Sequence, residues 1–492
     1  KHHATDSAVP QGAAEYRKQH DIKVSSVTGR CPDPVVTFAQ ANLPSVLLDQ
    51  LLKAGYKEPS AIQAQAWPIA LEGGDLIAIA STGSGKTVGY LLPALVRMHS
   101  GEMRLLDGPP PPPSGGSRHR NFNQSSYAGP LTLVMAPTRE LAVQIQKEAA
   151  RFGAPLGINS VVLYGGMPRR EQISALNRYQ PQLVVATPGR LLDLVNSGEL
   201  PLQHVQYLCL DEADRMLDMG FEDDIKEVVR MCPEPPTRQT CFFSATWPKE
   251  VRQLAGVLAG RQPVQLFIGQ VGDSPVAARS IVQEVAVLAG RSEKLTCLND
   301  YLQDVFGAAK QAGAAGVKTK VEPPRVLIFS ATKRGCDELA WQIKSQSGLP
   351  PANSVHSDLS QGQREHALQN FRTGRVPILV ATDVASRGLD IPHVTAVVNY
   401  DPPPPGNADA YVHRIGRTGR AGASGRSLVM LLKNDETEQK FGAQLIKILT
   451  EAHQEVPQEL SDMAARARSS SGDSRGYNRS GSRGYGQQGS SR

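Results

Sequence analysis

Short apolar runs alternate with helical patterns along most of this 492-residue chain, and this alternation restricts the fold more than any other feature. Helical patterns separate the runs, for example at 139–152 and 221–231, and near 335–347 and 361–373. Such alternation is typical of parallel sheets covered by helices on both faces. The expected buried strands are 75–80, 131–136, 161–164, 183–186, 207–210 and 240–243 in a first block, and 326–329, 378–381, 395–399 and 427–432 in a second.

The two blocks predict two similar α/β domains rather than one large sheet. Val-Val-Ala-Thr at 184–187 and Leu-Val-Ala-Thr at 379–382 each end a strand in a polar loop. The chain is also too long for a single hydrophobic core. We expect a first domain over 36–268, a linker over 269–280 and a second domain over 281–455.

Four segments have compositions that build a core poorly. Residues 1–35 are polar and lack sustained periodicity, which predicts a flexible N-terminal extension. An insert at 107–129 contains five consecutive prolines and predicts a mobile loop. A second insert at 307–324, rich in Ala, Gly and Lys, predicts a frayed helix. Residues 456–492, which turn to Ser, Gly and Arg from about 461, predict a disordered tail.

The distribution of charge and cysteine along the chain indicates in which cellular compartment the protein works. The net charge is +6, and six arginines against two aspartates place +4 of it in residues 461–492. The six cysteines are scattered without a CxxC pair, which favours a reducing compartment. No secretory signal or membrane-length apolar run is visible. We therefore expect a protein of the nucleus, with the nucleolus included, or of the cytoplasm, neither secreted nor in a membrane.

A glycine-rich loop follows the strand 75–80 and leads into an apolar helical stretch, which is the context that a phosphate-binding loop requires. Glycines let backbone N–H groups turn toward phosphate oxygens, a lysine reaches the β- and γ-phosphates, and a hydroxyl can ligate Mg²⁺. The alternative is a flexible Gly/Ser loop, and Ala80 stands where the usual pattern begins with glycine. The candidates are Ala80, Ser81, Thr82, Gly83, Ser84, Gly85, Lys86 and Thr87, with Lys86 also catalytic and Thr87 a metal ligand.

The apolar strand 207–210 ends abruptly in carboxylates. Asp211 can hold Mg²⁺, and Glu212 can orient or deprotonate an attacking water. A strand that runs into helix-capping acids is the ordinary alternative. Together with the glycine-rich loop, however, the acids indicate a nucleoside triphosphatase that uses Mg²⁺.

Further short motifs follow in a fixed order. They are Gly55-Tyr56 through Pro59 to Gln63, Pro137–Ala142, Gly165-Gly166, Thr187–Arg190, Ser244–Thr246, Ala381–Asp383 through Arg387–Asp390, and His413–Arg420. With the two motifs above, they resemble the DEAD-box RNA helicases of superfamily 2 from about Phe38 to Leu449. Residues 215–221 and 244–251 further resemble a nuclear subgroup associated with RNA processing and ribosome assembly.

The resemblance implies two tandem RecA-like domains that bind ATP and Mg²⁺. Gln63 would hydrogen-bond the adenine edge, with Tyr56 and Phe38 packing around the base. An amide offers both a donor and an acceptor, which suits adenine. The same residues also predict an amphipathic helix that begins at Ser60, and such a helix is compatible with adenine binding by Gln63.

The resemblance also assigns catalytic groups to the second domain. Arg417 and Arg420 would be arginine fingers, three apart on one helix face, that neutralise charge on the γ-phosphate. His413 and Asp390 would link domain closure to the nucleotide. The groups that would couple the acidic strand to the domain interface are Asp214, Ser244, Thr246 and Arg387.

RNA contacts would come from loops at strand ends, through hydroxyls, backbone amides and a few arginines that read phosphate and 2′-OH groups. Binding through the core is therefore expected to be independent of RNA sequence. Arginines and tyrosines of the tail (475–477 and 483–485) would add charge and stacking. The candidate contacts are Thr138, Arg139, Gly166, Thr187, Pro188, Gly189, Arg190, Arg364, Thr382 and Asp383.

The favoured function is an RNA-dependent ATPase that binds single-stranded or short duplex RNA as a monomer, and that separates short duplexes or remodels RNA–protein complexes by domain closure. Components of such complexes would be its protein partners. The same motifs suit an ATP-gated RNA clamp or scaffold. A DNA helicase or chromatin translocase is a weaker alternative.

Overall fold

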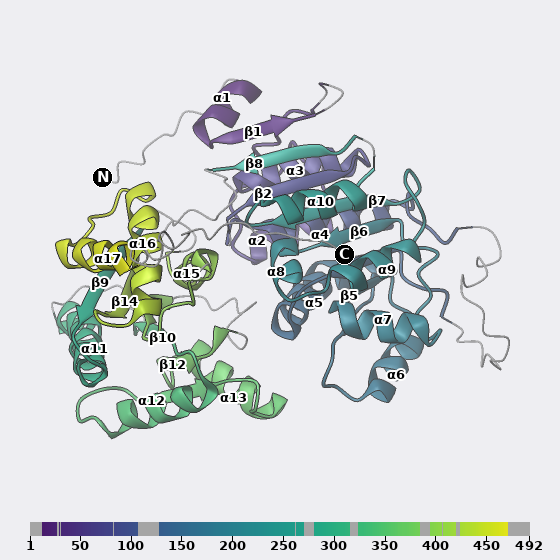
Figure 1. The fold of residues 1–492 in the computed structure, drawn as a ribbon. Helices are drawn as coiled ribbons and strands as arrows, with labels where there is room; N and C mark the ends of the chain where they lie inside the picture. The colour runs from purple at the N-terminus through teal and green to yellow at the C-terminus, as the bar shows by residue number, and fades with distance from the viewer. Residues whose placement is uncertain are drawn as a thin grey trace, which may run out of the picture.

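The chain forms two α/β domains, each built on its own sheet (Figure 1). The computed structural model describes residues 12–26, 29, 31–81, 83–106, 127–260, 262–269, 280–314, 323–383, 394–405, 407–419 and 424–470. Within these ranges no helix is both long enough and apolar enough to span a membrane. The two-domain α/β architecture predicted from the alternating pattern is confirmed.

The first sheet has eight strands in the order β1-β8-β2-β7-β6-β3-β5-β4. Every neighbouring pair is parallel except β1 with β8, which is antiparallel. All strands from β2 to β7 that lie inside the sheet are fully buried, as continuous apolar runs predict. The strands are β1 Ile22–Ser25, β2 Leu76–Ala80, β3 Thr132–Met135, β4 Ser160–Leu163, β5 Leu183–Ala186, β6 Tyr207–Leu210, β7 Gln239–Ser244 and β8 Val264–Ile268.

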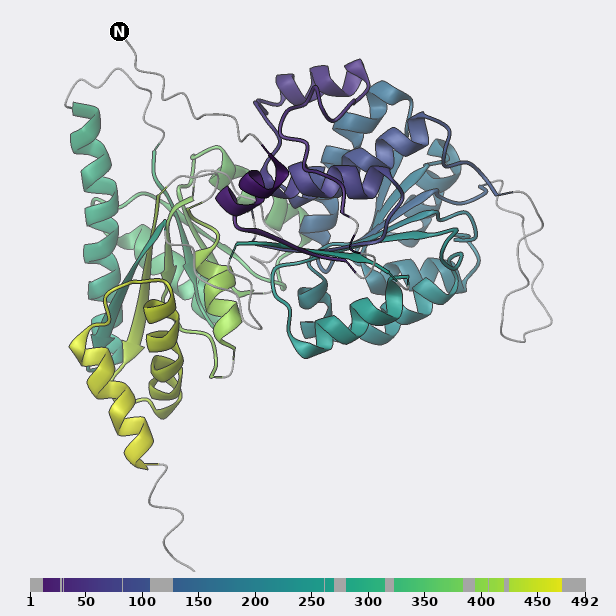
Figure 2. The same ribbon diagram turned by 90° about the horizontal axis from the view of Figure 1, so that it is seen from above.

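Helices cover both faces of this sheet, and each face has its own core. The core on one face is filled from α2, α3, α4 and α5, and that on the other from α6 to α10, so purple and teal helices lie on opposite sides in Figure 2. The helices are α1 Ala13–Gln19, α2 Ser45–Lys53, α3 Ala61–Leu71, α4 Lys86–His99, α5 Arg139–Gly153, α6 Arg169–Tyr179, α7 Pro188–Asn196, α8 Ala213–Asp218, α9 Glu222–Arg230 and α10 Lys249–Leu258.

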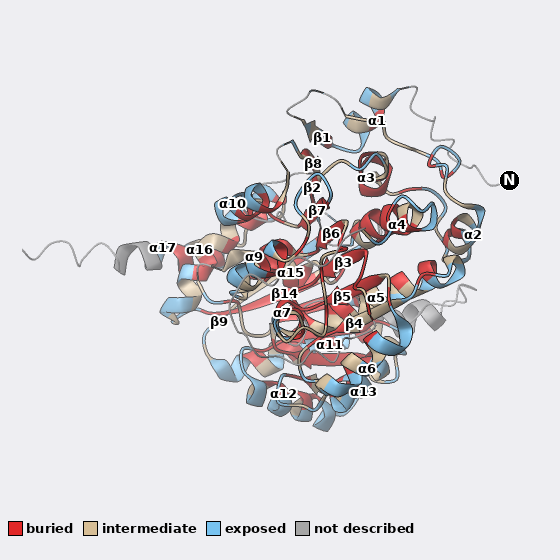
Figure 3. Ribbon diagram, turned by 90° about the vertical axis from the view of Figure 1, so that its right-hand side faces the viewer, coloured by how far each residue is buried: buried red, intermediate tan, exposed pale blue. Residues whose placement is uncertain are grey.

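The second sheet has six parallel strands in the order β11-β12-β10-β13-β14-β9. Helices α11 and α12 pack on one face, and α13, α15, α16 and α17 on the other. In Figure 3 the strands are mostly red, and hence buried, whereas the blue exposed surface lies mostly on the helices. The strands are β9 Ile281–Leu288, β10 Arg325–Phe329, β11 Ala352–Val355, β12 Ile378–Ala381, β13 Val394–Asn399 and β14 Gly425–Leu432. The helices are α11 Arg291–Ala314, α12 Lys333–Ser345, α13 Gln361–Arg372, α15 Ala408–Ile415, α16 Glu436–Glu451 and α17 Gln458–Ser470.

The described part of the N-terminal extension corrects the prediction for residues 1–35. Strand β1 pairs with β8 and becomes the edge of the first sheet, while Tyr16 on α1 is buried. Arg17 fixes this segment to α3, because its guanidinium donates to Gln65 and to the carbonyl oxygen of Pro32, both at 2.8 Å. The polar composition hid an edge strand, since only one of its faces is covered.

The tail prediction for 456–492 is also wrong at its start, because α17 packs against α16. Leu460 and Met463 are fully buried, and Gly442 on α16 leaves room for both side chains. Residues 471–492 lie outside the described residues. The Ser- and Arg-rich composition concealed two apolar residues three apart, which are enough to dock one helix face.

The two inserts are partly described. In the second, α11 continues as a helix to Ala314, and 315–322 lie outside the described residues. In the first, 107–126 lie outside them, but Tyr127 is buried and its hydroxyl donates to the carbonyl oxygen of Pro181 at 2.6 Å. The end of the proline-rich insert is therefore anchored to the first domain.

Candidate nucleotide site and RNA-facing loops

The glycine-rich loop joins β2 to α4 and contains two glycines in the left-handed backbone region. The φ angles are 78° at Gly83 and 95° at Gly85, which residues with side chains rarely adopt. A Cβ atom at Gly85 would lie 2.6 Å from Nε2 of Gln63 and 2.8 Å from Oγ of Ser60. The loop is thus shaped by backbone conformation and by the start of α3 packed beneath it. Thr82 lies outside the described residues.

Lys86 begins α4 as a buried cation with neutral partners. Its ammonium donates to the carbonyl oxygens of Ala80 at 3.0 Å and of Ser244 at 3.4 Å. Ser84 closes the loop by donating to the carbonyl oxygen of Ser81 at 2.8 Å. The hydrogen bonds of this ammonium go to neutral carbonyl groups, so an anionic phosphate group suits this position.

Gln63 is bonded to the loop rather than directed to open space. Its Oε1 accepts from the backbone of Ser60 at 3.0 Å, and its Nε2 donates to the carbonyl oxygen of Gly85 at 3.1 Å. Helix α3 begins with this capping box, as the Ser60 prediction required. The helix is not amphipathic, however, because it is buried on nearly all sides. Contact between Gln63 and an adenine would require its amide to exchange one of these partners.

The predicted aromatic neighbours of the adenine belong to the first core. Phe38 is buried, and its ring centroid lies 6.2 Å from that of Trp67 on α3. Tyr56 is half-buried and packs against the same core. Both residues therefore support α3 in this structure, and their place beside a base stays a prediction.

Asp211 and Glu212 stand at the carboxyl end of β6. Oδ1 of Asp211 accepts from the backbone N–H of Glu212 at 2.9 Å, and Oδ2 accepts from the hydroxyl of Tyr90 at 2.8 Å. Burial raises the pKa of Asp211 to about 6, although Lys86 opposes the shift. Glu212 has a φ of 51°, an uncommon conformation that turns the chain from strand into α8.

The donor set suits Mg²⁺ and a triphosphate. Asp211 offers a carboxylate and Thr87 a hydroxyl, and Mg²⁺ is commonly bound by one or two protein oxygens together with substrate phosphates. The two left-handed glycines and Lys86 form the cradle expected for the phosphates. These residues therefore fit the two groups that the sequence motifs imply.

Asp214 connects the acidic strand end to the loop after β7. One of its carboxylate oxygens accepts from the backbone N–H groups of Ala245 at 3.3 Å and Thr246 at 3.0 Å, and from the Thr246 hydroxyl at 2.8 Å. Ser244 completes the contact by accepting from the backbone N–H of Asp214 at 3.4 Å. The predicted coupling residues Asp214, Ser244 and Thr246 thus form one hydrogen-bonded unit, and Arg387 lies outside the described residues.

His413 of the second domain interacts electrostatically with Asp214 of this unit. Burial lowers the pKa of His413, and the charge of Asp214 acts in the opposite direction. Burial alone would raise the pKa of Asp214, but His413, Lys86 and the hydroxyls beside it hold that pKa below its ordinary value. The two domains therefore meet at the acidic motif.

The arginine-finger prediction needs a correction in its geometry. Helix α15 ends at Ile415, so Arg417 lies in the following turn and not on a helix face. Its Nε donates to the carbonyl oxygen of His413 at 3.3 Å. Arg420 and Asp390 lie outside the described residues. The loss of helix after Ile415 has a simple cause, since Gly416 and Gly419 favour a turn.

The predicted RNA contacts of the first domain lie on three loops after β3, β4 and β5. Thr138 caps α5 by accepting from the backbone N–H of Leu141 at 3.3 Å. Gly166 has a φ of 89°, and a Cβ atom there would overlap the guanidinium of Arg139. Thr187 occupies the N-cap of α7, with Pro188 and Gly189 in its first turn. The carboxyl edge of the sheet thus brings these loops together.

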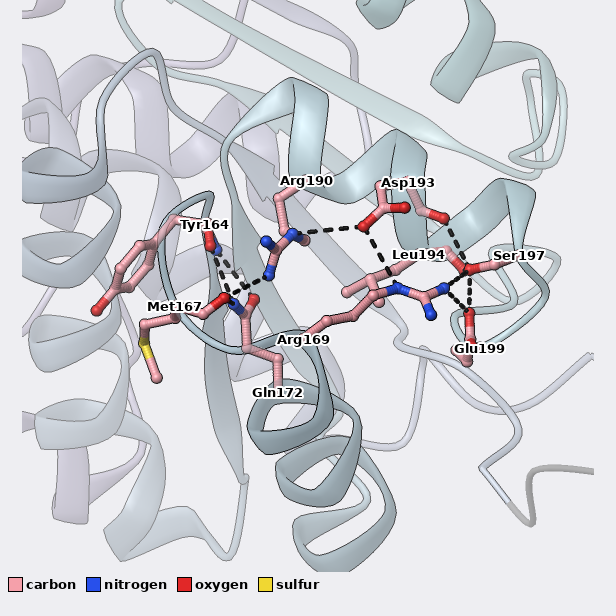
Figure 4. A network of polar contacts seen from close by, with 9 residues as sticks. All are labelled: Tyr164, Met167, Arg169, Gln172, Arg190, Asp193, Leu194, Ser197 and Glu199. Carbon is pink, nitrogen blue, oxygen red and sulfur yellow. Dashed lines mark hydrogen bonds and ion pairs between the residues drawn. The ribbon is translucent and has the colours of Figure 1, made fainter.

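Arg190 is fixed by the network shown in Figure 4. Its Nη1 donates to the carbonyl oxygen of Met167 at 3.2 Å, and its Nε lies 3.5 Å from Asp193. Asp193 also pairs with Arg169 at 3.4 Å. Gln172 holds the loop from the other side, since it accepts from the backbone of Tyr164 at 3.1 Å and donates to it at 3.0 Å. The network ties the loop after β4 to α7.

Two predicted RNA contacts of the second domain form ion pairs instead. Asp383 holds Arg414 through two bonds of 2.6 and 2.7 Å. Arg364 pairs with Glu140 of the first domain, and both side chains are about nine-tenths buried. Thr382 is buried, and its backbone N–H donates to Val355 at 3.3 Å. Asp383 and Arg364 therefore serve in positioning the loops and the domains in this structure.

Sequence reasoning missed the partners that hold the site residues in place. Tyr90, Glu140 and Arg414 carry no site prediction, although each bonds a residue that does. Arg414 lies inside the motif 413–420, and Glu140 inside 137–142. Their positions in these motifs could have indicated that they belong to the site. Tyr90 lies in an apolar helical stretch that offered no such signal.

Two α/β domains in tandem, with a phosphate-binding loop in the first, define the tandem RecA-like class. A family model described as DEAD/DEAH box helicase matches residues 60–254, and one described as helicase conserved C-terminal domain matches 305–422. The chain belongs to the DEAD-box helicase family.

Similar proteins include DEAD-box ATP-dependent RNA helicase 40 of Oryza sativa subsp. japonica, which is 46% identical over 451 residues that cover 92% of this chain and 50% of that protein. ATP-dependent RNA helicase DBP2 of Saccharomyces cerevisiae is 40% identical over 476 residues, covering 97% of this chain and 78% of that protein. The chain thus spans half of the rice relative and more of the yeast one. Among solved structures, S. cerevisiae Dbp5 bound to RNA and ADP BeF3 has a TM-score of 0.64 at 27% identity, with 88% of this chain and 99% of that chain covered.

Proposed function

We propose that this protein is an RNA-dependent ATPase that separates short RNA duplexes or remodels RNA–protein complexes. The observation that carries the proposal is the phosphate-binding loop with the Asp211 and Glu212 carboxylates in the first domain, together with the electrostatic interaction between Asp214 there and His413 of the second domain. A nucleotide site completed by two domains can transmit closure to RNA loops on the same domains. The relatives named as ATP-dependent RNA helicases support the same activity.

The residues divide the chemistry in a simple way. Lys86 and the loop N–H groups hold the phosphates, and Glu212 orients or deprotonates the attacking water. Asp211 and Thr87 would hold Mg²⁺, which neutralises phosphate charge when bound. Arg417 supplies a guanidinium from the second domain, so hydrolysis requires the two domains to be closed.

RNA binding is proposed for the loops after β3, β4 and β5 and for the facing loops of the second domain. Hydroxyls and backbone N–H groups there suit phosphate and 2′-OH groups, which predicts little dependence on RNA sequence. The relative Dbp5 was solved with RNA and ADP BeF3, and its likeness over both domains supports this assignment. A monomeric state, RNA–protein complexes as targets and a nuclear or cytoplasmic location stay predictions.

The test is the rate of ATP hydrolysis with and without single-stranded RNA, repeated with Glu212→Gln. We expect RNA to raise the rate of the wild type and Glu212→Gln to abolish the increase. Equal rates with and without RNA would rule out coupling, and an active Glu212→Gln would rule out Glu212 as the group that activates water.

An ATP-gated RNA clamp remains the second candidate, favoured by the interdomain pair of Arg364 and Glu140, which holds the domains together. A strand-displacement assay beside an RNA-binding assay separates the two functions. ATP-dependent binding with displacement supports the helicase, and equally tight binding without displacement supports the clamp.

A further inference from the structure

Tyr90 is bonded to one of the two predicted Mg²⁺ ligands. It follows Thr87 by three residues on α4, is fully buried, and donates its hydroxyl to Oδ2 of Asp211 at 2.8 Å. The phenol therefore joins α4, the helix that begins at the phosphate-binding loop, to the carboxylate at the end of β6.

The hydroxyl is a fixed donor. A tyrosine hydroxyl has an ordinary pKa of about 10, so it carries its proton at neutral pH. The Tyr90 ring packs 5.2 Å from that of Phe243, and its backbone carbonyl oxygen accepts from the hydroxyl of Tyr207 at 2.9 Å. The packed ring and the anchored backbone of Tyr90 together keep its hydroxyl in one place.

The second oxygen of Asp211 is held from the other side, since Oδ1 accepts from the backbone N–H of Glu212 at 2.9 Å. An ionised carboxylate has about four acceptor sites, so both oxygens keep capacity for a metal ion or its water. Two donors, one on each oxygen, leave the carboxylate little freedom to rotate.

We propose that Tyr90 is a positioning residue for the metal site, whose hydroxyl holds the Asp211 carboxylate in one orientation so that Mg²⁺ meets a preformed ligand. The inference rests on the proposed function, because it takes Asp211 and Thr87 as the ligands. The competing explanation is that Asp211 merely satisfies a hydroxyl buried in the core. The two explanations differ in their effect on Mg²⁺ affinity.

The test uses Tyr90→Phe, which removes one oxygen and keeps the ring, in the full chain. Binding of a fluorescent ATP analogue is titrated with free Mg²⁺, and also measured in EDTA. We expect the half-saturating Mg²⁺ concentration to rise about five-fold, the change that corresponds to one lost hydrogen bond. Binding in EDTA should not change.

The matched control is Tyr127→Phe, which loses a buried hydroxyl bonded elsewhere in the first domain, to the carbonyl oxygen of Pro181 at 2.6 Å. A Mg²⁺ shift in Tyr90→Phe alone supports the proposal. No shift in Tyr90→Phe, or the same shift in both variants, overturns it. A Tyr90→Phe effect that persists unchanged in an Asp211→Asn background also overturns it, because Tyr90 would then act without Asp211.

Failure of the proposed function itself would give a different result in these assays. In that case the wild type itself would show no Mg²⁺-dependent binding of the analogue and no RNA-stimulated hydrolysis. A wild type that shows both, beside a Tyr90→Phe variant with wild-type Mg²⁺ dependence, would contradict the role of Tyr90 alone.

Discussion

Arg364 of the second domain forms an ion pair with Glu140 of the first, and the two side chains keep only 10% and 9% of their surface exposed. The pair lies within reach of the RNA-facing loops, because Glu140 directly follows Arg139 at the start of α5. Arg364 was expected to contact RNA, whereas here it connects the domains. The pair is therefore a direct link between domain closure and the loop that carries Thr138 and Arg139.

Replacing Glu140 by Gln should weaken closure. Leaving one member of a buried pair without its counter-charge costs about 3–5 kcal/mol if the group stays buried, so the domains are expected to part instead. We expect affinity for RNA with a non-hydrolysable ATP analogue to fall about ten-fold or more, a change of about 1.4 kcal/mol. Fluorescence anisotropy of labelled RNA measures it.

The control for this change is Glu338→Gln, which breaks the pair of Arg334 and Glu338 on the surface of α12, where the side chains are 89% and 57% exposed. Such a pair contributes about 0–1 kcal/mol. RNA affinity that falls equally in both variants, or in neither, would show that the Glu140 pair does not hold the closed state.

Gly166→Ala should weaken RNA binding with little effect on nucleotide binding. A Cβ atom there would overlap the Arg139 guanidinium, and the φ of 89° is strained for any other residue. The displaced arginine can no longer hold its place at the loop, so we expect RNA affinity to fall about ten-fold. The matched control is Gly157→Ala, which carries a similar backbone strain at a φ of 75° but has open space around its Cβ. Equal RNA affinity in the two variants would remove Gly166 and Arg139 from the RNA site.

The stability of Asp211→Asn relative to wild type should increase with pH. Burial raises the pKa of Asp211 from 3.8 to about 6, so the folded state holds this proton more tightly than the unfolded state. Stability is then lost as the pH rises from about 4 through 6, by up to about 3 kcal/mol. Asn does not titrate and escapes this loss. Urea denaturation in EDTA at pH 4 to 7.5 measures the difference.

For Asp214→Asn we expect the opposite dependence of stability on pH. The pKa of Asp214 is lowered in the folded state, so its carboxylate stabilises the fold above its unfolded pKa, and this contribution is lost as the pH falls. The variant should therefore be less stable than wild type at neutral pH and approach it in acid. Parallel pH profiles for the two variants would contradict the assigned environments of both carboxylates.

The sequence predicts the centre of the fold well and its edges poorly. Strands such as β2 and β7 lie inside a parallel sheet, so they read as continuous apolar runs that need no partner to be recognised. Strand β1 has one covered face and is completed only by β8, which is far away in sequence. Helix α17 depends in the same way on α16, whose Gly442 admits Leu460 and Met463.

The residues of the candidate site also differ in how well the sequence predicts them. Gly83, Gly85 and Lys86 are recognisable because the chemistry fixes their types and their spacing. Asp383 and Arg364 are charged residues whose roles are set by partners elsewhere in the chain, Arg414 and Glu140. A pattern of residues along the chain cannot contain such pairings, because tertiary contacts create them.

The central claim is that the nucleotide site is completed by the second domain. Arg417→Ala tests it most directly, through hydrolysis of ATP at saturating RNA and binding of a fluorescent ATP analogue. An arginine finger contributes about 10³-fold or more to the rate, so we expect a loss of at least about 100-fold in RNA-stimulated hydrolysis, with analogue binding within about three-fold of wild type. RNA-stimulated hydrolysis at the wild-type rate would contradict the two-domain site.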